Sequence, residues 1–202
     1  MTKLEFKLMQ INSFALLALL LNEMQTNYEK YIDIQKASTA ILAIAGTQYS
    51  ISTYLYKRYP NVAEEIRYID WILTTPLLLY TYWKLANVHG YKSDFMYLGF
   101  SVVLMVILGF FAEYTTENSY FLFVLSFVPY LYILYEIKQI QKMFNDKNMS
   151  DHATLGNFFI YGWAVYPIAF YAPDTYKYTL YSIGDFINKG VYSMFLYKLL
   201  QN

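Results

Sequence analysis

The sequence contains no cysteine, and its two histidines are His89 and His152. Without cysteine the chain can form neither a disulfide framework nor a thiolate metal site. Both histidines fall in polar connections between apolar segments, so we expect no metal centre inside the protein. Charged residues are also scarce, at 15% of the 202 residues, against roughly 25% in soluble domains. Too few charges remain to cover a soluble globule of this size.

Hydrophobic residues make up 57% of the chain and gather into long runs. A membrane-spanning helix needs roughly 20 mostly apolar residues, and we count seven such segments. The second segment has the weakest apolar signal because it is rich in Thr, Gln and Ser. The predicted spans are residues 5–25, 35–57, 63–85, 94–115, 118–141, 153–172 and 178–200. The sequence therefore predicts an all-α membrane protein, a seven-transmembrane-helix bundle that forms a single domain over residues 1–202.

Basic residues suggest how this bundle is oriented in its membrane. An odd number of spans places the two termini on opposite sides. One side carries Lys30, Lys36, Lys84, Lys92, Lys138, Lys142, Lys147 and Lys198, and the other carries Lys3, Lys7, Lys57, Arg58 and Lys177. Because cytoplasmic loops are enriched in Lys and Arg, we expect the N-terminus outside and the C-terminus in the cytoplasm.

Four charged residues fall inside the predicted spans: Arg67, Asp70, Asp185 and Lys189. An ionisable residue inside a membrane is costly, so it needs a partner or a function. Helical spacing places Arg67, Asp70, Thr74 and Thr81 on one face of the third span, and Asp185 and Lys189 one turn apart on the seventh. Two cations and two carboxylates make a neutral set. A static ion-pair network joining these two helices would explain the charges alone, since membrane helices also use polar contacts for packing.

Three separate motifs favour a functional explanation. The third span, around Arg67–Pro76, resembles the third helix of microbial rhodopsins almost residue for residue, and Asp185–Lys189 resembles the retinal-binding segment of proteorhodopsins. Trp163, Tyr166, Pro167 and Phe170 follow the sixth-helix pattern of the same family. The short loops and the abundant Tyr, Lys and Asn are also similar to the viral branch of that family.

This resemblance implies that Lys189 carries all-trans retinal as a protonated Schiff base in the centre of the bundle. A primary amine is required there because only it condenses with an aldehyde to an imine that can still be protonated. By the same resemblance, Asp70 is the main counter-ion and first proton acceptor, and Asp185 is the second carboxylate. Arg67 is the cation that keeps both ionised, and Thr74 is placed to hydrogen-bond Asp70. Two phenols, Tyr54 and Tyr166, are expected to hold Asp185.

Aromatic and small residues at helical spacing are expected to form the walls of the retinal pocket, although such a stripe also occurs in ordinary cores. The predicted wall residues are Trp71, Thr75, Leu78, Met105, Gly109, Phe123, Ser126, Tyr130, Trp163, Tyr166, Pro167 and Phe170. Leu78 stands where members of the family tune colour, and a leucine there resembles the green-absorbing type.

The resemblance implies a light-driven transporter or sensor and not an enzyme, and an outward proton pump fits best because the Asp70 acceptor is present. The usual carboxylate donor is absent, since Thr81 occupies its place and a hydroxyl cannot replace it. Glu23, Glu136 or bulk water could supply the proton instead. Thr53 replaces the histidine that partners the acceptor in proteorhodopsins. A light-gated cation channel, hydrated by Gln48, Ser50, Ser52, Thr53, Asn12 and Ser13, and a photosensor acting on a separate transducer remain open.

The expected partners follow from the same resemblance. They are the lipid bilayer, protons or small cations, and further copies of the chain in a homo-oligomer, either a pentamer or a trimer. No nucleic-acid partner is expected.

Overall fold

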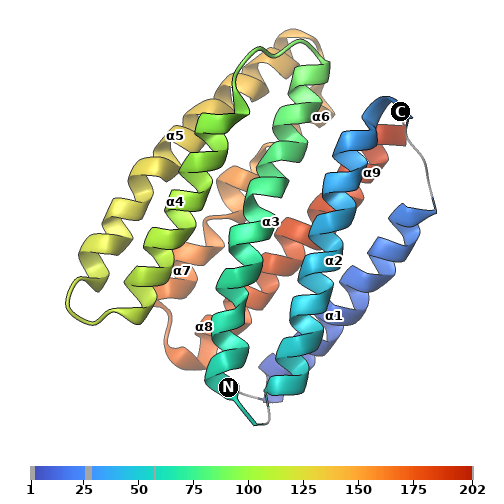
Figure 1. Ribbon diagram of the computed structural model, residues 1–202. Coiled ribbons are helices and arrows are strands. Elements are labelled where there is room, and N and C mark those ends of the chain that lie inside the picture. The colour runs from blue at the N-terminus through green and yellow to red at the C-terminus, as the bar shows by residue number, and fades with distance from the viewer. Residues whose placement is uncertain (1–2, 26–28, 57, 202) are drawn as a thin grey trace.

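The computed structural model describes residues 3–25, 29–56 and 58–201. These residues form seven helical rods that lie side by side (Figure 1). Each rod overlaps one predicted span, so the seven-helix bundle is confirmed. A short 3-10 turn, η1 (Glu29–Tyr31), precedes the second rod. Five rods are continuous α-helices: α1 (Lys3–Met24), α2 (Ile32–Leu55), α3 (Pro60–Val88), α4 (Phe95–Tyr114) and α5 (Ser119–Asp146).

The sixth and seventh rods are each interrupted near the middle by a π-helical segment. The sixth consists of α6 (Ser150–Leu155), η2 (Phe158–Gly162) and α7 (Val165–Tyr171). The seventh consists of α8 (Asp174–Asp185), η3 (Phe186–Val191) and α9 (Tyr192–Gln201). Short π segments inside α-helices are rare and frequently occur at functional sites. Lys189 lies within η3.

The side chain of Asn188 links the two π segments. Its Nδ2 donates to the carbonyl of Gly184, one turn earlier, at 2.8 Å, and to the carbonyl of Gly162 in η2 at 3.0 Å. Gly162 must lack a side chain because a Cβ at this position would overlap the Asn188 amide. The backbone next to Lys189 is thus held against the sixth rod.

The ring of helices closes where α1 contacts α8 and η3. The N-terminus and the C-terminus lie at opposite ends of the bundle (Figure 1), as an odd number of rods requires. We call the half nearer the C-terminus the inner half and the half nearer the N-terminus the outer half. Lys189 lies between them.

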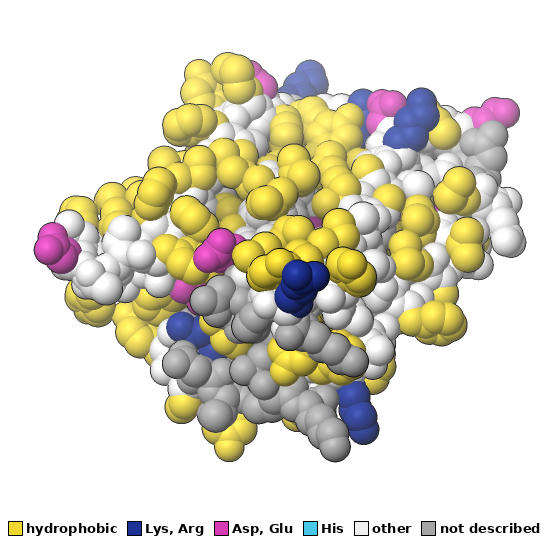
Figure 2. Space-filling view, turned by 60° about the horizontal axis from the view of Figure 1, so that its bottom comes forward, with side chains coloured by type: hydrophobic (Ala, Val, Ile, Leu, Met, Phe, Trp, Pro, Cys, Tyr) yellow, Lys and Arg dark blue, Asp and Glu magenta, His cyan; other side chains and the backbone are white. Residues whose placement is uncertain are grey.

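The surface of the bundle is apolar where a soluble protein would be polar. Phe14 in α1 is 77% exposed and Phe100 in α4 is 67% exposed, whereas Lys189 is 2% exposed. Hydrophobic side chains also cover much of the described surface in the view of Figure 2. By length and hydropathy alone, three helices of the described residues, α1, α4 and α5, could cross a membrane. The polar residues of α2 do not contradict a span, since Gln35, Ser38, Gln48 and Ser52 are buried.

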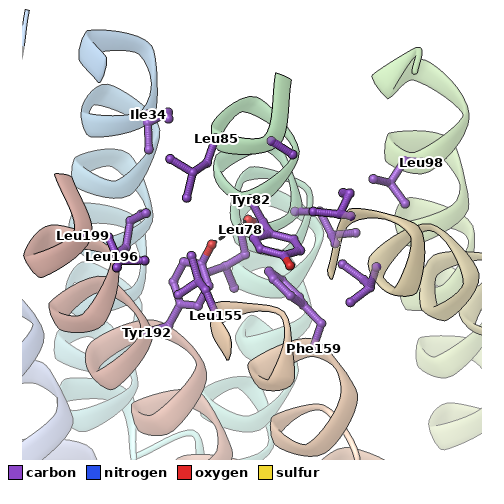
Figure 3. Packing of buried hydrophobic residues seen from close by; sticks show 14 of the residues in the cluster. Ile34, Leu78, Tyr82, Leu85, Leu98, Leu155, Phe159, Tyr192, Leu196 and Leu199 are labelled. Carbon is purple, nitrogen blue, oxygen red and sulfur yellow. Dashed lines mark hydrogen bonds between the residues drawn. The ribbon is translucent and has the colours of Figure 1, made fainter. Parts of the chain in front are cut away.

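Two apolar groups fill the bundle on either side of Lys189. The inner apolar cluster lies between α3, the sixth rod and α9, and includes Leu78, Tyr82, Phe159, Tyr192 and Leu196 (Figure 3). The outer cluster consists of Tyr68, Trp71, Val106, Ala169 and Tyr181. Lys189 and its carboxylate partners occupy the level between these two clusters.

Candidate functional site

The amine of Lys189 lies between two buried carboxylates. Its Nζ donates a hydrogen bond to Asp70 Oδ2 and lies 3.5 Å from Asp185 Oδ1. The side chains of both aspartates are 0% exposed. Removing an ion from water costs several kcal/mol unless an opposite charge is close. The predicted pairing of one cation with two carboxylates is therefore what stabilises charge at this depth.

The two carboxylates differ in their hydrogen bonds. Asp185 accepts three: from Trp71 Nε1 and Tyr166 Oη at 2.9 Å each, and from Tyr49 Oη at 2.8 Å. Asp70 has the Lys189 amine on Oδ2, but among the described residues no donor reaches its Oδ1. Hydrogen bonds to a carboxylate favour its charged form. Asp185 thus has three neutral donors besides the nearby Lys189 amine, whereas Asp70 has the Lys189 amine on one oxygen and no described donor on the other.

The two threonines predicted on the Asp70 face of α3 are fully buried. Thr74 hydrogen-bonds Asp70, but through the main-chain carbonyl, at 2.9 Å. Thr81 lies two further turns towards the inner end, where its hydroxyl is 2.7 Å from Tyr192 Oη. Thr81 is therefore not in direct contact with Lys189.

Arg67 is buried on the same face of α3 but is surrounded by aromatic rings. Its guanidinium carbon lies 4.9 Å from the ring centre of Tyr181, 5.1 Å from that of Tyr178 and 5.8 Å from that of Trp71. Among the described residues, no carboxylate forms an ion pair with Arg67. The cation–π contacts stabilise its charge, and its expected effect on Asp70 and Asp185 stays a prediction.

Glu113, which was not among the predicted site residues, contacts two tyrosines of the outer cluster. Tyr68 Oη lies 2.5 Å and Tyr181 Oη 3.3 Å from its Oε2, and Lys177 Nζ is 3.6 Å from Oε1. Helical spacing could have indicated that Glu113 and Tyr181 lie near the site, because Glu113 is one turn from Gly109 and Tyr181 is one turn from Asp185. A part-buried carboxyl group therefore adjoins the outer cluster and shares Tyr181 as a neighbour with Arg67.

The expectation that Tyr54 holds Asp185 is wrong. Tyr54 is 85% exposed, and Tyr49 occupies the position expected for it. Five residues turn a helix by about 140° beyond one full turn, so the two phenols point to nearly opposite sides of α2. The buried residues Leu42, Ala45, Tyr49 and Ser52 recur at three- and four-residue intervals, and this stripe would have identified Tyr49. Tyr166 does contact Asp185, as expected.

We expect Tyr49→Phe to destabilise the protein by about 1–3 kcal/mol, since one oxygen of a buried carboxylate loses its donor. Tyr54→Phe is the matched control, because it removes the same hydroxyl from an exposed side chain of the same helix. Thermal unfolding of both variants in detergent measures the difference. Equal stability of the two variants would contradict the assignment.

A cavity with about 850 Å³ of empty volume, counting its opening, extends from Lys189 across the bundle. All twelve predicted wall residues line it. Several are in ring contact: Phe123 stacks on Phe170 with centres 4.4 Å apart, and Trp71 meets Tyr166 edge-on at 4.9 Å. Sequence reasoning missed four further wall residues: Tyr68, Val106, Phe127 and Tyr181. The mainly apolar lining of the cavity, with the polar group of Lys189 on its wall, is that of a small-molecule site.

In the part of the chain that the structure describes, no group of three His, Cys, Asp or Glu residues is arranged to hold a metal ion. His89 and His152 face each other at the inner end with ring centres 5.3 Å apart.

One protein family matches the chain over almost its whole length. A family model described as a bacteriorhodopsin-like protein matches residues 3–202. A green-light absorbing proteorhodopsin from Gamma-proteobacterium EBAC31A08 is 25% identical over 150 residues, covering 66% of this chain and 59% of that protein. Sensory rhodopsin-2 from Haloarcula vallismortis is 34% identical over 110 residues, covering 51% of this chain and 45% of the relative. The matched part is thus less than two thirds of each relative's length.

Solved structures show the same fold over nearly the whole chain. Exiguobacterium sibiricum rhodopsin aligns with a TM-score of 0.83 at 22% identity, covering 99% of this chain and 97% of the other. Xanthorhodopsin, described as a light-driven ion pump with dual chromophore, aligns with a TM-score of 0.84 at 21% identity, covering 98% and 92%. The similarity in composition to the viral branch stays a prediction.

Proposed function

The chain belongs to the bacteriorhodopsin-like family, and from this we propose that it is an outward proton pump driven by light absorbed by all-trans retinal on Lys189. When bound there as a Schiff base, retinal would supply light absorption and a nitrogen-bound proton whose release light can drive. Among the relatives are proteins described as proteorhodopsins, a light-driven chloride pump and sensory rhodopsins. The residues around Lys189 favour proton transport among these possibilities.

The cavity is suited to a long apolar chromophore. Its wall is formed mainly by aromatic and aliphatic side chains, and the amine of Lys189 is the group on this wall that can condense with an aldehyde. Gly109 leaves open space, because a Cβ built there meets no atom within 4 Å. Trp71, Tyr166 and Trp163 approach the lysine from α3 and the sixth rod and would restrict how the ligand lies.

Filling the space at Gly109 should prevent ligand binding. We expect Gly109→Ala to form pigment normally, because its Cβ meets nothing within 4 Å. Gly109→Phe places a large ring in the cavity, and we expect pigment yield to fall at least about tenfold, which corresponds to 1.4 kcal/mol or more of lost binding. Titration with retinal, followed by visible absorption, measures both variants. Full pigment formation by Gly109→Phe would place the ligand elsewhere.

The single observation that carries the pump proposal is the difference between the two carboxylates beside Lys189. Asp185 accepts hydrogen bonds from Trp71, Tyr166 and Tyr49, whereas Asp70 Oδ1 has no donor among the described residues. A base must lie within hydrogen-bond reach of the proton that it takes up, and Asp70 already accepts a bond from the Lys189 nitrogen. Asp70 is therefore the acceptor, and Asp185 remains charged.

A route outwards from Asp70 passes through the outer cluster. Arg67 is one turn of α3 closer to the outer end, and its guanidinium packs on the Tyr181 ring. Tyr181 and Tyr68 in turn contact Glu113. This arrangement of a buried cation, two phenols and a carboxylate gives a released proton polar groups to follow. With the N-terminus outside and the C-terminus in the cytoplasm, as the distribution of Lys and Arg favours, the proton leaves the cell.

A light-gated cation channel is the second candidate, because buried polar side chains also follow the contact between α1, α2 and α8. Asn12 donates to the Ser182 carbonyl at 2.8 Å, and Gln48 donates to Ser52 Oγ at 2.8 Å. These groups bond to one another or to the backbone and would have to separate before ions could pass. The pump requires no such opening, and we therefore rank it first.

Illuminated cells that contain the protein and retinal test the proposal. An outward pump lowers the external pH in the light, and a proton-carrying uncoupler abolishes the change. A sensor leaves the external pH constant. The family resemblance further predicts a pentamer or a trimer.

A further inference from the structure

Return of the proton to the Lys189 nitrogen needs a source in the inner half, and α3 has a threonine, Thr81, where that source is expected. The Thr81 hydroxyl is hydrogen-bonded to Tyr192 Oη. A threonine hydroxyl cannot act as a proton-donating acid. The inner apolar cluster surrounds this pair, with Leu78, Tyr82 and Phe159 packed against Tyr192 (Figure 3). The hydroxyls of Thr81, Tyr82 and Tyr192 in this region could pass a proton on, but none of them can supply one.

A buried carboxyl group lies elsewhere in the inner half, between the end of α1 and the start of α2. Glu23, near the end of α1, is 6% exposed. Ser38 Oγ donates to its Oε1 at 2.8 Å, and Thr39 Oγ1 lies 3.4 Å from Oε2. Gln35 Nε2 donates to the main-chain carbonyl of Glu23 at 3.0 Å. The start of α2 thus encloses Glu23, and burial disfavours the charged form of a carboxyl group.

Hydroxyl groups extend from Glu23 towards the lysine. Ser38 Oγ is 3.3 Å from Ser193 Oγ on α9. Ser193 follows Lys189 by four residues, one turn of the same rod, which corresponds to about 6 Å along its axis. Water molecules would have to complete the path from the Ser193 hydroxyl to the lysine nitrogen. Glu23, Ser38 and Ser193 therefore form a polar path from α1 through α2 to the turn next to Lys189.

We propose that Glu23 is the internal proton donor that replaces the missing carboxylate at Thr81. This inference rests on the proposed pump function. In the step, the O–H bond of the Glu23 carboxyl breaks and an N–H bond forms at the Lys189 nitrogen, with the proton relayed by Ser38 and Ser193. Glu23 is left as a carboxylate and takes a proton from water at the inner surface. One proton enters from inside for each one that Asp70 has accepted.

Flash spectroscopy of Glu23→Gln tests the donor. We expect recovery of the visible absorption band after a flash to slow at least about tenfold, since a positioned acid contributes roughly 10²–10⁴-fold. Recovery should also slow further as the pH rises, because the proton must then come from solution. Glu136→Gln is the matched control: Glu136 lies in the inner half of α5, accepts a bond from Tyr91 Oη at 2.9 Å, and has no described link to Ser193. We expect the control to recover like the unaltered protein.

A second measurement does not depend on light or retinal. The infrared spectrum of the protein without retinal should contain the carbonyl band of a protonated carboxyl that is lost in Glu23→Gln and kept in Glu136→Gln. Absence of that difference, or unchanged recovery of Glu23→Gln while transport continues, would overturn the assignment of Glu23 alone. If light never removes the proton from the Lys189 nitrogen in the unaltered protein, the pump proposal fails and the donor role fails with it.

Discussion

We expect Lys189→Ala to stay colourless with added retinal, whereas the unaltered protein forms a visible pigment. Lys189 is the amine on the cavity wall, and no second amine lines the cavity among the described residues. The loss should be complete, because without the covalent bond neither the visible absorption nor the transported proton is present. Absorption spectra recorded during titration with retinal measure this directly.

Alanine at this position also leaves Asp70 and Asp185 without their shared cation, and breaking a buried ion pair typically costs about 3–5 kcal/mol. Lys189→Arg separates the two effects, since a guanidinium keeps the charge but does not form the imine. We expect Lys189→Arg to fold, as judged by circular dichroism, and to stay colourless. A pigment from either variant would show that retinal is bound elsewhere.

We expect Asp70→Asn to form pigment that absorbs at longer wavelength and to lose outward proton transport. The Asp70 carboxylate accepts the bond from Lys189, so removing its charge weakens the electrostatic stabilisation of the positive nitrogen in the ground state. Loss of a positioned base typically lowers the rate of a proton transfer by roughly 10²–10⁴-fold. Light-induced acidification measures transport, and the absorption maximum measures the shift.

Asp70→Glu is the matched control, because it keeps a carboxylate one methylene further along the side chain. We expect it to retain both the colour and part of the transport. Undiminished transport by Asp70→Asn would exclude Asp70 as the acceptor and would make the second carboxylate, Asp185, the alternative.

The charged centre could be predicted from sequence because each part of it follows from helix geometry. Asp185 and Lys189 are one turn apart, and Arg67, Asp70 and Thr74 share a face, whatever the neighbouring helices do. Intramembrane charge is costly enough that these residues must meet in the interior. The structure places Lys189 between the two aspartates, as this reasoning expects.

Other features depend on contacts between helices and could not be read from spacing in one helix. Arg67 lies against Tyr178 and Tyr181 because α8 packs beside α3, and sequence spacing alone predicts an ion pair there. The two π segments η2 and η3 are joined by the hydrogen bond from Asn188 to the Gly162 carbonyl, a contact between two rods. Similarly, Glu23 was visible in the sequence as a carboxylate near the end of a span, but its path to Ser193 through Ser38 appears only when α1, α2 and α9 are packed together.

Light-evoked current, recorded at several voltages across a membrane that contains only this protein and retinal, tests the pump proposal most directly. Moving one charge outwards against ~150 mV requires about 3.5 kcal/mol, which a pump can draw from light and a channel cannot. We predict a current that stays outward at every voltage in this range and disappears in Asp70→Asn. A current that reverses direction with the ion gradient would contradict the pump and indicate a channel, and the absence of any current would indicate a sensor.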